Sequence, residues 1–475
     1  MPPEELDPRR WRALAVCLSA GFLTLLDVSI VNVALPSIES GLGAGARDLQ
    51  WILTGYAVAF GLVLVSAGRL GDARGRRRMF LIGVTLFTAA SALAGLAPGP
   101  GWLSAARVLQ GIGAGVLNPQ VAGFIQSLFP GRERARAFGA FGASVGLSTA
   151  VGPVLGGLII DLVGGPNAWR WVFLVNIPVG IVVLVLAVRL LPEPASGRQD
   201  TRLDPVGVLL LGAATVLILL PMISESSVPL GERPWWLLVL GLVLLAVFAL
   251  WERRVGGRGG APVVDLRLFT HRSYALGAAL AMSYFAGFTS IFFILTLTLQ
   301  AGLGYSPLQA GLAATPFAIG GAVAAITGGR LVTRFGRSLV AGGLVLSLLG
   351  VLGTAAVTLV VDGPALGWAV VLPQLVAGAG SGLTITPNQT LTLSEVPIAG
   401  GGSAAGVIQT GQRIGTALGI AFTGTIFFGL VAGSTSYPRA LAVSMLVVAG
   451  FMTLALAIAL TDVRLGRRDG PTGVA

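Results

Sequence analysis

The sequence predicts an all-α integral membrane protein, and two observations lead to that fold class. Hydrophobic residues make up 54% of the 475 residues and charged residues only 11%, so lipid must cover much of the apolar surface. Apolar runs of the roughly 20 residues needed to cross a bilayer recur from Trp11 to Leu460. Since lipid offers the backbone no hydrogen bonds, such runs must be helices, and their lack of polar alternation excludes a barrel.

We predict fourteen membrane-spanning helices. Their boundaries follow the ends of the apolar runs, which lie at residues 11–36, 50–69, 79–98, 101–124, 136–163, 170–191, 205–224, 234–252, 273–300, 306–330, 338–361, 366–389, 402–431 and 439–460.

The arginines predict the orientation of these spans. All 31 basic residues are arginines, and most fall in alternate loops that share one side of the membrane. The other side receives only Arg47, Arg170, Arg233 and Arg439. Because positively charged loops stay in the cytoplasm, we expect a multi-pass protein of the cytoplasmic (inner) membrane with both termini cytoplasmic and an uncleaved first span.

Composition also argues against several other functions. Cys17 is the only cysteine and His271 the only histidine, so neither a disulfide nor a Cys/His metal site is expected, and nothing indicates a cofactor. The net charge of +11 is spread over loops rather than gathered for nucleic acid. Gly111 and Gly113 lie in an apolar run and not at a strand-to-helix turn. We therefore expect neither an enzyme nor a nucleic-acid partner, and we expect a monomer.

An internal repeat predicts the domain organisation. The segment Gly68–Arg76 is echoed by Gly329–Arg337, and Gly111, Gly113 and Gly115 are echoed by Gly378, Gly380 and Gly382 at nearly the same separation. One duplication explains both echoes. The prediction is a six-helix half at residues 1–191, a linker with two extra spans at 192–272, and a second six-helix half at 273–475.

Several motifs resemble those of one family. The segments that carry the resemblance are Leu26–Pro36, Gly68–Arg77, Arg107–Gly113, Gly152–Gly157 and Trp169–Pro178, with a departure at Ala73, where the family usually has a basic residue. They are similar to the fourteen-helix drug:proton antiporters of the major facilitator superfamily over essentially the whole chain. The resemblance implies proton-coupled export of hydrophobic or cationic drugs across the membrane by alternating access.

Asp27 is the expected proton carrier. It is the only acidic residue deep in a predicted span, ~14 Å inward from Pro36 at 1.5 Å per helical residue. A carboxylate inside the membrane is costly and usually marks an ion path. The resemblance links Arg107 to proton transfer, and its long side chain can reach the level of Asp27. The alternatives are a permanently paired structural carboxylate and a static packing role for Arg107.

Two further motifs predict moving or packing parts. Gly68, Asp72, Gly75 and Arg76 end one span and begin the next, where a carboxylate can pair with an arginine or a helix N-terminus as a conformational latch. The alternative is a solvated charge run. Gly152, Pro153, Gly156 and Gly157 match the antiporter motif of the resembled family. Small residues allow helices to approach closely there, which ordinary packing also explains.

Polar and aromatic side chains within the spans are candidates for a substrate cavity between the halves. They are Asn32, Tyr56, Gln110, Asn118, Tyr284, Gln374, Asn388, Gln409 and Arg413. Arg413 serves either cavity electrostatics or the contact between helices.

The expected partners are hydrophobic small molecules, protons and the bilayer. Two other functions stay open: export of a specific lipid or secondary metabolite by the same machinery, and a membrane receptor or scaffold that transports nothing.

Overall fold

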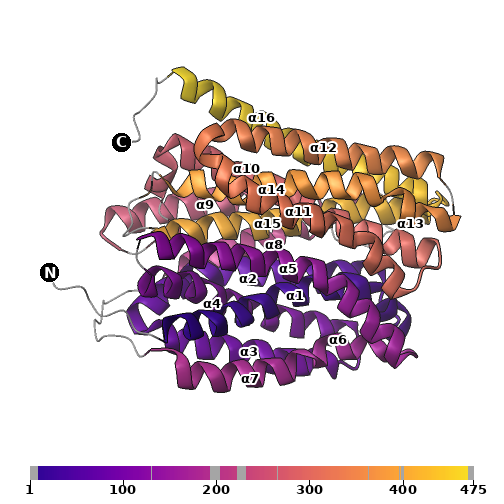
Figure 1. Ribbon diagram of the computed structural model, residues 1–475, viewed down its shortest axis with the longest axis horizontal. Coiled ribbons are helices and arrows are strands. Elements are labelled where there is room, and N and C mark those ends of the chain that lie inside the picture. The colour runs from indigo at the N-terminus through magenta and orange to yellow at the C-terminus, as the bar shows by residue number, and fades with distance from the viewer. Residues whose placement is uncertain are drawn as a thin grey trace.

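The computed structural model describes residues 9–129, 131–192, 204–221, 232–260, 262–264, 266–361, 363–394, 396 and 401–468, and every regular element within these ranges is helical (Figure 1). The first elements are α1 (Arg10–Leu42), α2 (Ala46–Arg74), α3 (Arg76–Gly95), α4 (Pro100–Leu128), α5 (Gly131–Val163), η1 (Ala168–Arg170), α6 (Trp171–Leu174) and α7 (Asn176–Leu190). Then come α8 (Pro205–Leu219), α9 (Trp236–Gly257), η3 (Leu266–Thr270), α10 (Arg272–Leu297), η4 (Thr298–Gly302), α11 (Pro307–Phe335), α12 (Arg337–Val360), η5 (Gly363–Ala365), α13 (Leu366–Ala369), α14 (Val371–Leu393), α15 (Gly401–Ala432) and α16 (Tyr437–Arg468).

The all-α membrane fold class is confirmed. Among the described residues, 13 helical segments are long and apolar enough to cross a membrane, with η1, α6 and α7 joined into one of them, Ala168–Leu190. The shorter apolar helix α8 corresponds to the seventh predicted span, and residues 222–224 of that span lie outside the described residues.

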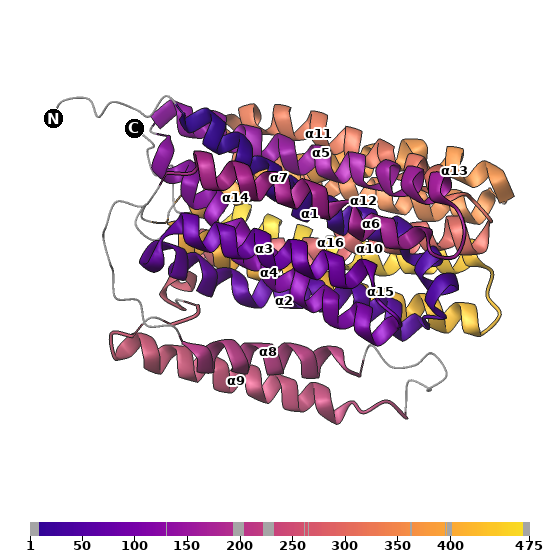
Figure 2. The same cartoon turned by 90° about the horizontal axis from the view of Figure 1, so that it is seen from below.

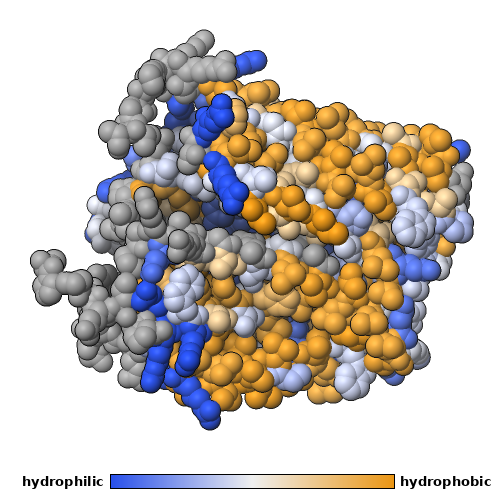
Figure 3. Space-filling view, in the orientation of Figure 1, coloured by the Kyte–Doolittle hydropathy of each residue, from blue (hydrophilic) through white to orange (hydrophobic). Residues whose placement is uncertain are grey.

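The outer surface is apolar around the middle of the bundle. Figure 3 shows hydrophobic side chains across the visible face and hydrophilic ones toward the end at which α1 begins. Helix α16 ends at the same end of the bundle (Figure 1). We call this the arginine-rich end, because Arg10, Arg74, Arg76 and Arg337 lie at helix ends there. The other end is called the opposite end.

The helices pack in two similar groups, α1–α7 and α10–α16. In the first group, α4 packs on α2 and α3; in the second, α14 packs on α11 and α12. The repeated glycines make both contacts possible. A Cβ on Gly111 would lie 2.4 Å from the Tyr56 carbonyl oxygen, and a Cβ on Gly378 would lie 1.9 Å from the Phe317 carbonyl oxygen. The sequence echo therefore corresponds to repeated packing, while the domain boundaries stay a prediction.

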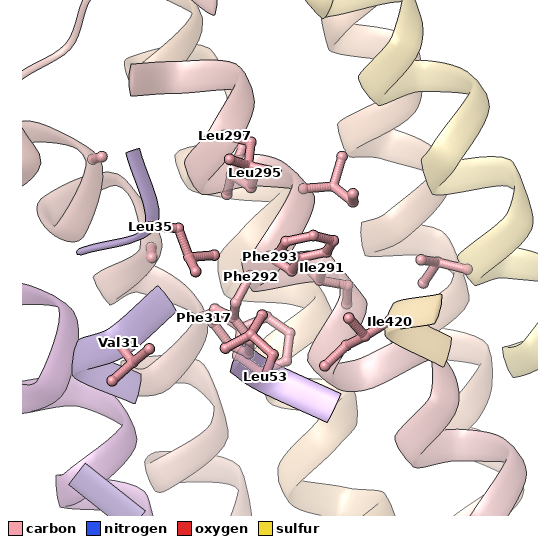
Figure 4. Packing of buried hydrophobic residues seen from close by; sticks show 14 of the residues in the cluster. Val31, Leu35, Leu53, Ile291, Phe292, Phe293, Leu295, Leu297, Phe317 and Ile420 are labelled. Carbon is pink, nitrogen blue, oxygen red and sulfur yellow. The ribbon is translucent and has the colours of Figure 1, made fainter. Parts of the chain in front are cut away.

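The two groups touch along two seams, α5 on α11 and α2 on α15. Near the opposite end a shared apolar cluster joins them: Figure 4 shows Val31, Leu35 and Leu53 of the first group beside Phe292, Phe317 and Ile420 of the second. Two hydrogen bonds cross between the groups at this level. Gln300 Nε2 donates to the Val33 carbonyl oxygen at 2.8 Å, and Ser306 Oγ donates to Asp161 Oδ2 at 3.1 Å.

The helices α8 and α9 pack against each other and lie beside the rest of the bundle (Figure 2). Helix α8 touches α2 and α15. A Cβ on Gly212 of α8 would lie 3.3 Å from Leu62 of α2. Helix α9 exposes Trp236, Val239 and Leu250 by 62–65%, as a lipid-facing helix does. The extra pair thus covers the α2–α15 seam from outside.

We predict that Gly378→Ala destabilises the second group. The new methyl group would overlap the Phe317 carbonyl, so α14 and α11 must separate, at a cost of roughly 1–3 kcal/mol for an overpacked contact. Gly342→Ala on α12 is the control, because a Cβ there meets nothing within 4 Å. Thermal unfolding of the purified variants measures both. A melting temperature of Gly378→Ala equal to that of Gly342→Ala would contradict the close contact.

Candidate functional site

Asp27 lies in the middle of α1 and is completely buried. Its carboxylate accepts hydrogen bonds from side chains of two other helices. Arg107 Nη1 of α4 donates to Oδ2 in a buried ion pair. Gln110 Nε2 of α4 donates to Oδ1 at 3.2 Å, and Asn176 Nδ2 of α7 donates to Oδ1 at 2.8 Å. A single carboxylate therefore connects α1, α4 and α7.

Arg107 is held from several sides at once. Its Nε donates to the Ile52 carbonyl oxygen of α2 at 3.1 Å, and its Nη1 also donates to Gln110 Oε1 at 2.9 Å. The guanidinium carbon lies 4.2 Å from the centroid of the Tyr56 ring, a cation–π contact. Arg107 is 1% exposed. These partners fix the guanidinium against Asp27.

Two residues of this network were missed by the sequence reasoning. Ser91 of α3 accepts from Gln110 Nε2 at 2.7 Å and from Asn176 Nδ2 at 3.4 Å, and both Ser91 and Asn176 are buried. Asn176 begins α7. Its position in an otherwise apolar run, two residues before Pro178, was a signal for a buried hydrogen-bonding role.

The electrostatics of the site follow from these contacts. The carboxylate of Asp27 and the guanidinium of Arg107 form an ion pair, so together they carry no net charge. The three donors occupy three of the roughly four acceptor positions of the carboxylate, so the position of Arg107 sets the charge that Asp27 faces.

The other candidates in the first group line the same helices. Tyr56 Oη donates to the Thr24 carbonyl oxygen at 3.2 Å, and Asn118 Nδ2 donates to Thr24 Oγ1 at 3.1 Å. Both side chains are buried, as is Asn32. The carbonyl oxygen of the Asn32 side chain has no hydrogen-bond partner among the described residues. These residues join α1 to α2 and α4.

The candidates in the second group do not gather at one place. Tyr284 makes an edge-on contact with Phe285 and a tilted contact with Phe288, whose ring centroids lie 6.1 and 5.9 Å away. Gln374 Nε2 donates to Thr354 Oγ1 at 3.2 Å. Asn388 lies at the arginine-rich end, where its Oδ1 accepts from Arg337 Nη1 at 2.6 Å. Asn388 thus belongs to an ion-pair cluster and not to the surroundings of Tyr284.

This ion-pair cluster was also missed by the sequence reasoning. Arg337 Nε lies 2.7 Å from Asp462 Oδ2 of α16, and Arg272 Nε lies 3.7 Å from Asp462 Oδ1. Asp462 is 5% exposed, so Asp27 is not the only buried acid of the described chain. Asp462 lies near the end of α16, however, where its partners Arg272 and Arg337 begin α10 and α12.

Arg413 and Gln409 lie on α15, along the seam with α2. The Arg413 guanidinium carbon is 4.1 Å from the centroid of the Phe60 ring of α2. Both Arg413 and Gln409 are half-buried. The sequence reasoning left Arg413 between cavity electrostatics and helix contact, and its stacking on Phe60 brings it into contact with the other helix group.

The candidate latch residues lie at the α2–α3 junction. Gly75 separates the two helices with a φ of 100°, a conformation that favours glycine. Arg76 Nη1 donates to the Gly123 carbonyl oxygen of α4, and Gly68 lies beside Pro119 of α4. The side chain of Asp72 lies outside the described residues, so its pairing stays a prediction.

The glycines of the candidate antiporter motif lie at two helix contacts. A Cβ on Gly152 would lie 2.4 Å from Ser29 Cβ, and one on Gly156 would lie 2.7 Å from Ile30 Cγ1, both on α1. A Cβ on Gly157 would lie 2.4 Å from the Leu308 Cα of α11. Pro153 lies within α5, where its carbonyl oxygen faces Gly311 of α11. This segment therefore packs α5 on its own group and on the other group.

Among the described residues, no three His, Cys, Asp or Glu side chains lie together.

Two similarly packed helix groups with an ion pair buried inside the membrane define a polytopic membrane protein of the secondary-transporter type. The chain belongs to the Major Facilitator Superfamily, whose family model matches residues 17–420 and, in a second match, residues 276–472.

Three relatives illustrate where the chain stands in this family. It is 41% identical to the probable actinorhodin transporter of Streptomyces coelicolor, covering 89% of this chain and 73% of that protein. It is 38% identical to the puromycin resistance protein pur8 of Streptomyces alboniger (90% and 83%) and 34% identical to the multidrug resistance protein Stp of Mycobacterium tuberculosis (85% and 73%).

The fold is also that of a solved structure. A bacterial homolog of the human lysosomal transporter Spinster matches with a TM-score of 0.67 at 17% identity, covering 96% of this chain and 98% of that one.

We predict that Asp27→Asn destabilises the protein more than the double variant Asp27→Asn/Arg107→Gln. The single change leaves a buried guanidinium without its counter-ion, which costs about 3–5 kcal/mol, whereas removing both charges avoids that penalty. Thermal unfolding of the two single variants and the double variant measures the coupling. Additive losses of stability would mean that the ion pair does not hold the helices together.

Proposed function

We propose that this protein is a proton-coupled exporter of apolar small molecules that works by alternating access. The observation that carries the proposal is the fully buried Asp27–Arg107 pair, held by α1, α2, α4 and α7. A titratable carboxylate inside a membrane protein is costly and is retained where it moves ions. Asp27 is the proton carrier, and Arg107 displaces or admits the proton.

Alternating access requires an ion pair that can separate and helix groups that can move against each other. The ion pair between Asp27 of α1 and Arg107 of α4 joins these two helices through their side chains. In the proposed mechanism, a movement of Arg107 therefore changes the packing of α4 on α1. The glycines Gly152, Gly156 and Gly157 allow α5 to pack closely on both groups, and we assign them to a seam that limits proton leakage. The α2–α3 junction around Gly75 and Arg76 is the latch.

The names of the relatives support export. They include an actinorhodin transporter and proteins of puromycin and multidrug resistance, and outward transport of hydrophobic drugs is the function we propose for this chain. A second candidate is export of one specific secondary metabolite, which is favoured by relatives named for a single compound, such as the probable actinorhodin transporter. Of the candidate substrate residues, we assign this role to those on α2, α10 and α15, namely Tyr56, Tyr284, Gln409 and Arg413.

The proposed location is the cytoplasmic membrane, with the arginine-rich end and both termini in the cytoplasm. The support is the distribution of arginines, because Arg10, Arg74, Arg76 and Arg337 lie at one end of the bundle and positive charge is retained on the cytoplasmic side. Export then proceeds from the arginine-rich end to the opposite end.

We predict that the double variant Asp27→Asn/Arg107→Gln loses proton-driven uphill transport. The variant retains amide groups of similar shape but has no group that can carry a proton. Proteoliposomes with an imposed pH gradient, loaded with a fluorescent hydrophobic dye, measure transport and substrate-induced proton movement. Asp462→Asn is the control, because it also removes a buried, arginine-paired carboxylate, but at the end of α16. Gradient-driven accumulation by the double variant at the wild-type rate would show that the proton site lies elsewhere.

We predict that a cysteine at position 257 is labelled only from the cytoplasmic side. Gly257 ends α9 and is exposed, and a Cβ added there would meet nothing within 4 Å, so Gly257→Cys is accessible without disturbing packing. The native Cys17 is buried and is replaced in a Cys17→Ser background. Labelling of intact cells by a membrane-impermeant maleimide would reverse the proposed orientation, and labelling after permeabilisation serves as the positive control.

A further inference from the structure

Arg413 is a cation without a counter-ion among the described residues. It lies in the middle of α15 and is half-buried. Its contact across the seam is the Phe60 ring, and no described residue forms a hydrogen bond or an ion pair with its guanidinium. An aromatic face compensates a buried charge only in part. A charge inside the membrane without a partner is costly and marks a functional site.

The backbone around Arg413 is fixed by the other helix group. Thr410 Oγ1 donates to the Gly61 carbonyl oxygen of α2 at 2.8 Å. A Cβ on Gly61 would lie 2.8 Å from Arg413 Cβ, so only glycine allows α15 to approach α2 this closely. The amide of Gln409 lies one helical turn away on the same face of α15. No described residue forms a hydrogen bond with the Gln409 amide either. The Arg413 guanidinium and the Gln409 amide are therefore two neighbouring donor groups without acceptors among the described residues.

The charges of the neighbouring groups do not compensate Arg413. Of the buried acids in the described chain, Asp27 is bound to Arg107, Asp462 lies beside Arg337 and Arg272, and Glu252 accepts from the Val264 backbone N–H. The aromatic residues Phe60 and Tyr56, whose rings are 5.9 Å apart, separate Arg413 from Arg107. None of the buried acids of the described chain therefore neutralises Arg413.

We propose that the exported molecule is an anion whose carboxylate or phenolate binds Arg413 and Gln409 between the two helix groups. This inference rests on the proposed export function and names its substrate class. An arginine offers a planar set of donors that matches a carboxylate, and the Phe60 ring beside the guanidinium provides apolar surface next to those donors. The inference replaces the expectation of a cationic drug, which the positive charge of Arg413 would repel.

The test compares two xanthene dyes of similar size, anionic fluorescein and cationic rhodamine 6G, in equilibrium binding to the purified full-length protein by fluorescence anisotropy. Wild type should bind fluorescein more tightly than rhodamine 6G. Arg413→Gln should weaken fluorescein binding at least about tenfold, as expected when a charged partner is lost, and should not weaken binding of rhodamine 6G. Arg413→Lys retains the charge and should keep part of the affinity. Arg439→Gln, at an exposed site on α16, is the matched control and should change neither dye.

Two results would overturn the inference: a wild-type preference for rhodamine 6G, or fluorescein binding to Arg413→Gln that equals wild type. Both are read without a proton gradient. Failure of the proposed export would give a different result. Wild-type protein would still bind fluorescein through Arg413, but wild-type proteoliposomes would show no gradient-driven transport. An unchanged melting temperature of Arg413→Gln shows that lost binding is not lost folding.

Discussion

The first helix group depends on the ion pair between Asp27 and Arg107. Each charge alone would be expensive inside the membrane, and together they are acceptable only because the remaining hydrogen-bonding groups are also satisfied. Gln110, Asn176 and the Ile52 carbonyl oxygen provide those partners. The same arrangement that stabilises the pair also joins α1, α2, α4 and α7, so the proposed protonation step would act on the packing of all four helices.

Close helix contacts transmit such a change. The glycines that let α4 approach α2 also set the distance at which Arg107 reaches across to the Ile52 carbonyl, since Gly111 lies against Tyr56 one turn from Arg107. Gly157 and Gly311 likewise allow α5 and α11 to approach each other closely. Rigid contacts of this kind convert a local separation of charges into movement of whole helices, because packed interfaces shift between discrete arrangements rather than deform continuously.

The sequence predicted the fold more fully than the site. Hydropathy alone located the spans, and the repeated glycines predicted a duplication, which the structure shows as similar helix packing in the two groups. Asp27 and Arg107 were recognisable as rare charges in apolar runs, and their pairing followed from depth. Asn176 and Ser91 were not identified, because single polar residues near helix ends are common and only the fold brings them to Asp27. The contact of Asn388 with Arg337 was not predicted for a related reason: depth along a helix does not reveal which neighbouring helix supplies an arginine.

The charge of the substrate determines how the membrane potential acts on the proposed exchange. Export of a monovalent cation for one inward proton moves no net charge, whereas export of a monovalent anion moves two positive charges inward. Each charge is worth about 2.3 kcal/mol per 100 mV, so the second exchange gains about 4.6 kcal/mol from an inside-negative potential of that size. A cation would also compete directly with the proton for Asp27. An anion at Arg413 does not compete with the proton for Asp27. In the proposed exchange, helix packing must therefore exclude the proton from the substrate-loaded protein. The Asp27–Arg107 pair and the glycine contacts around it are the features that set this packing.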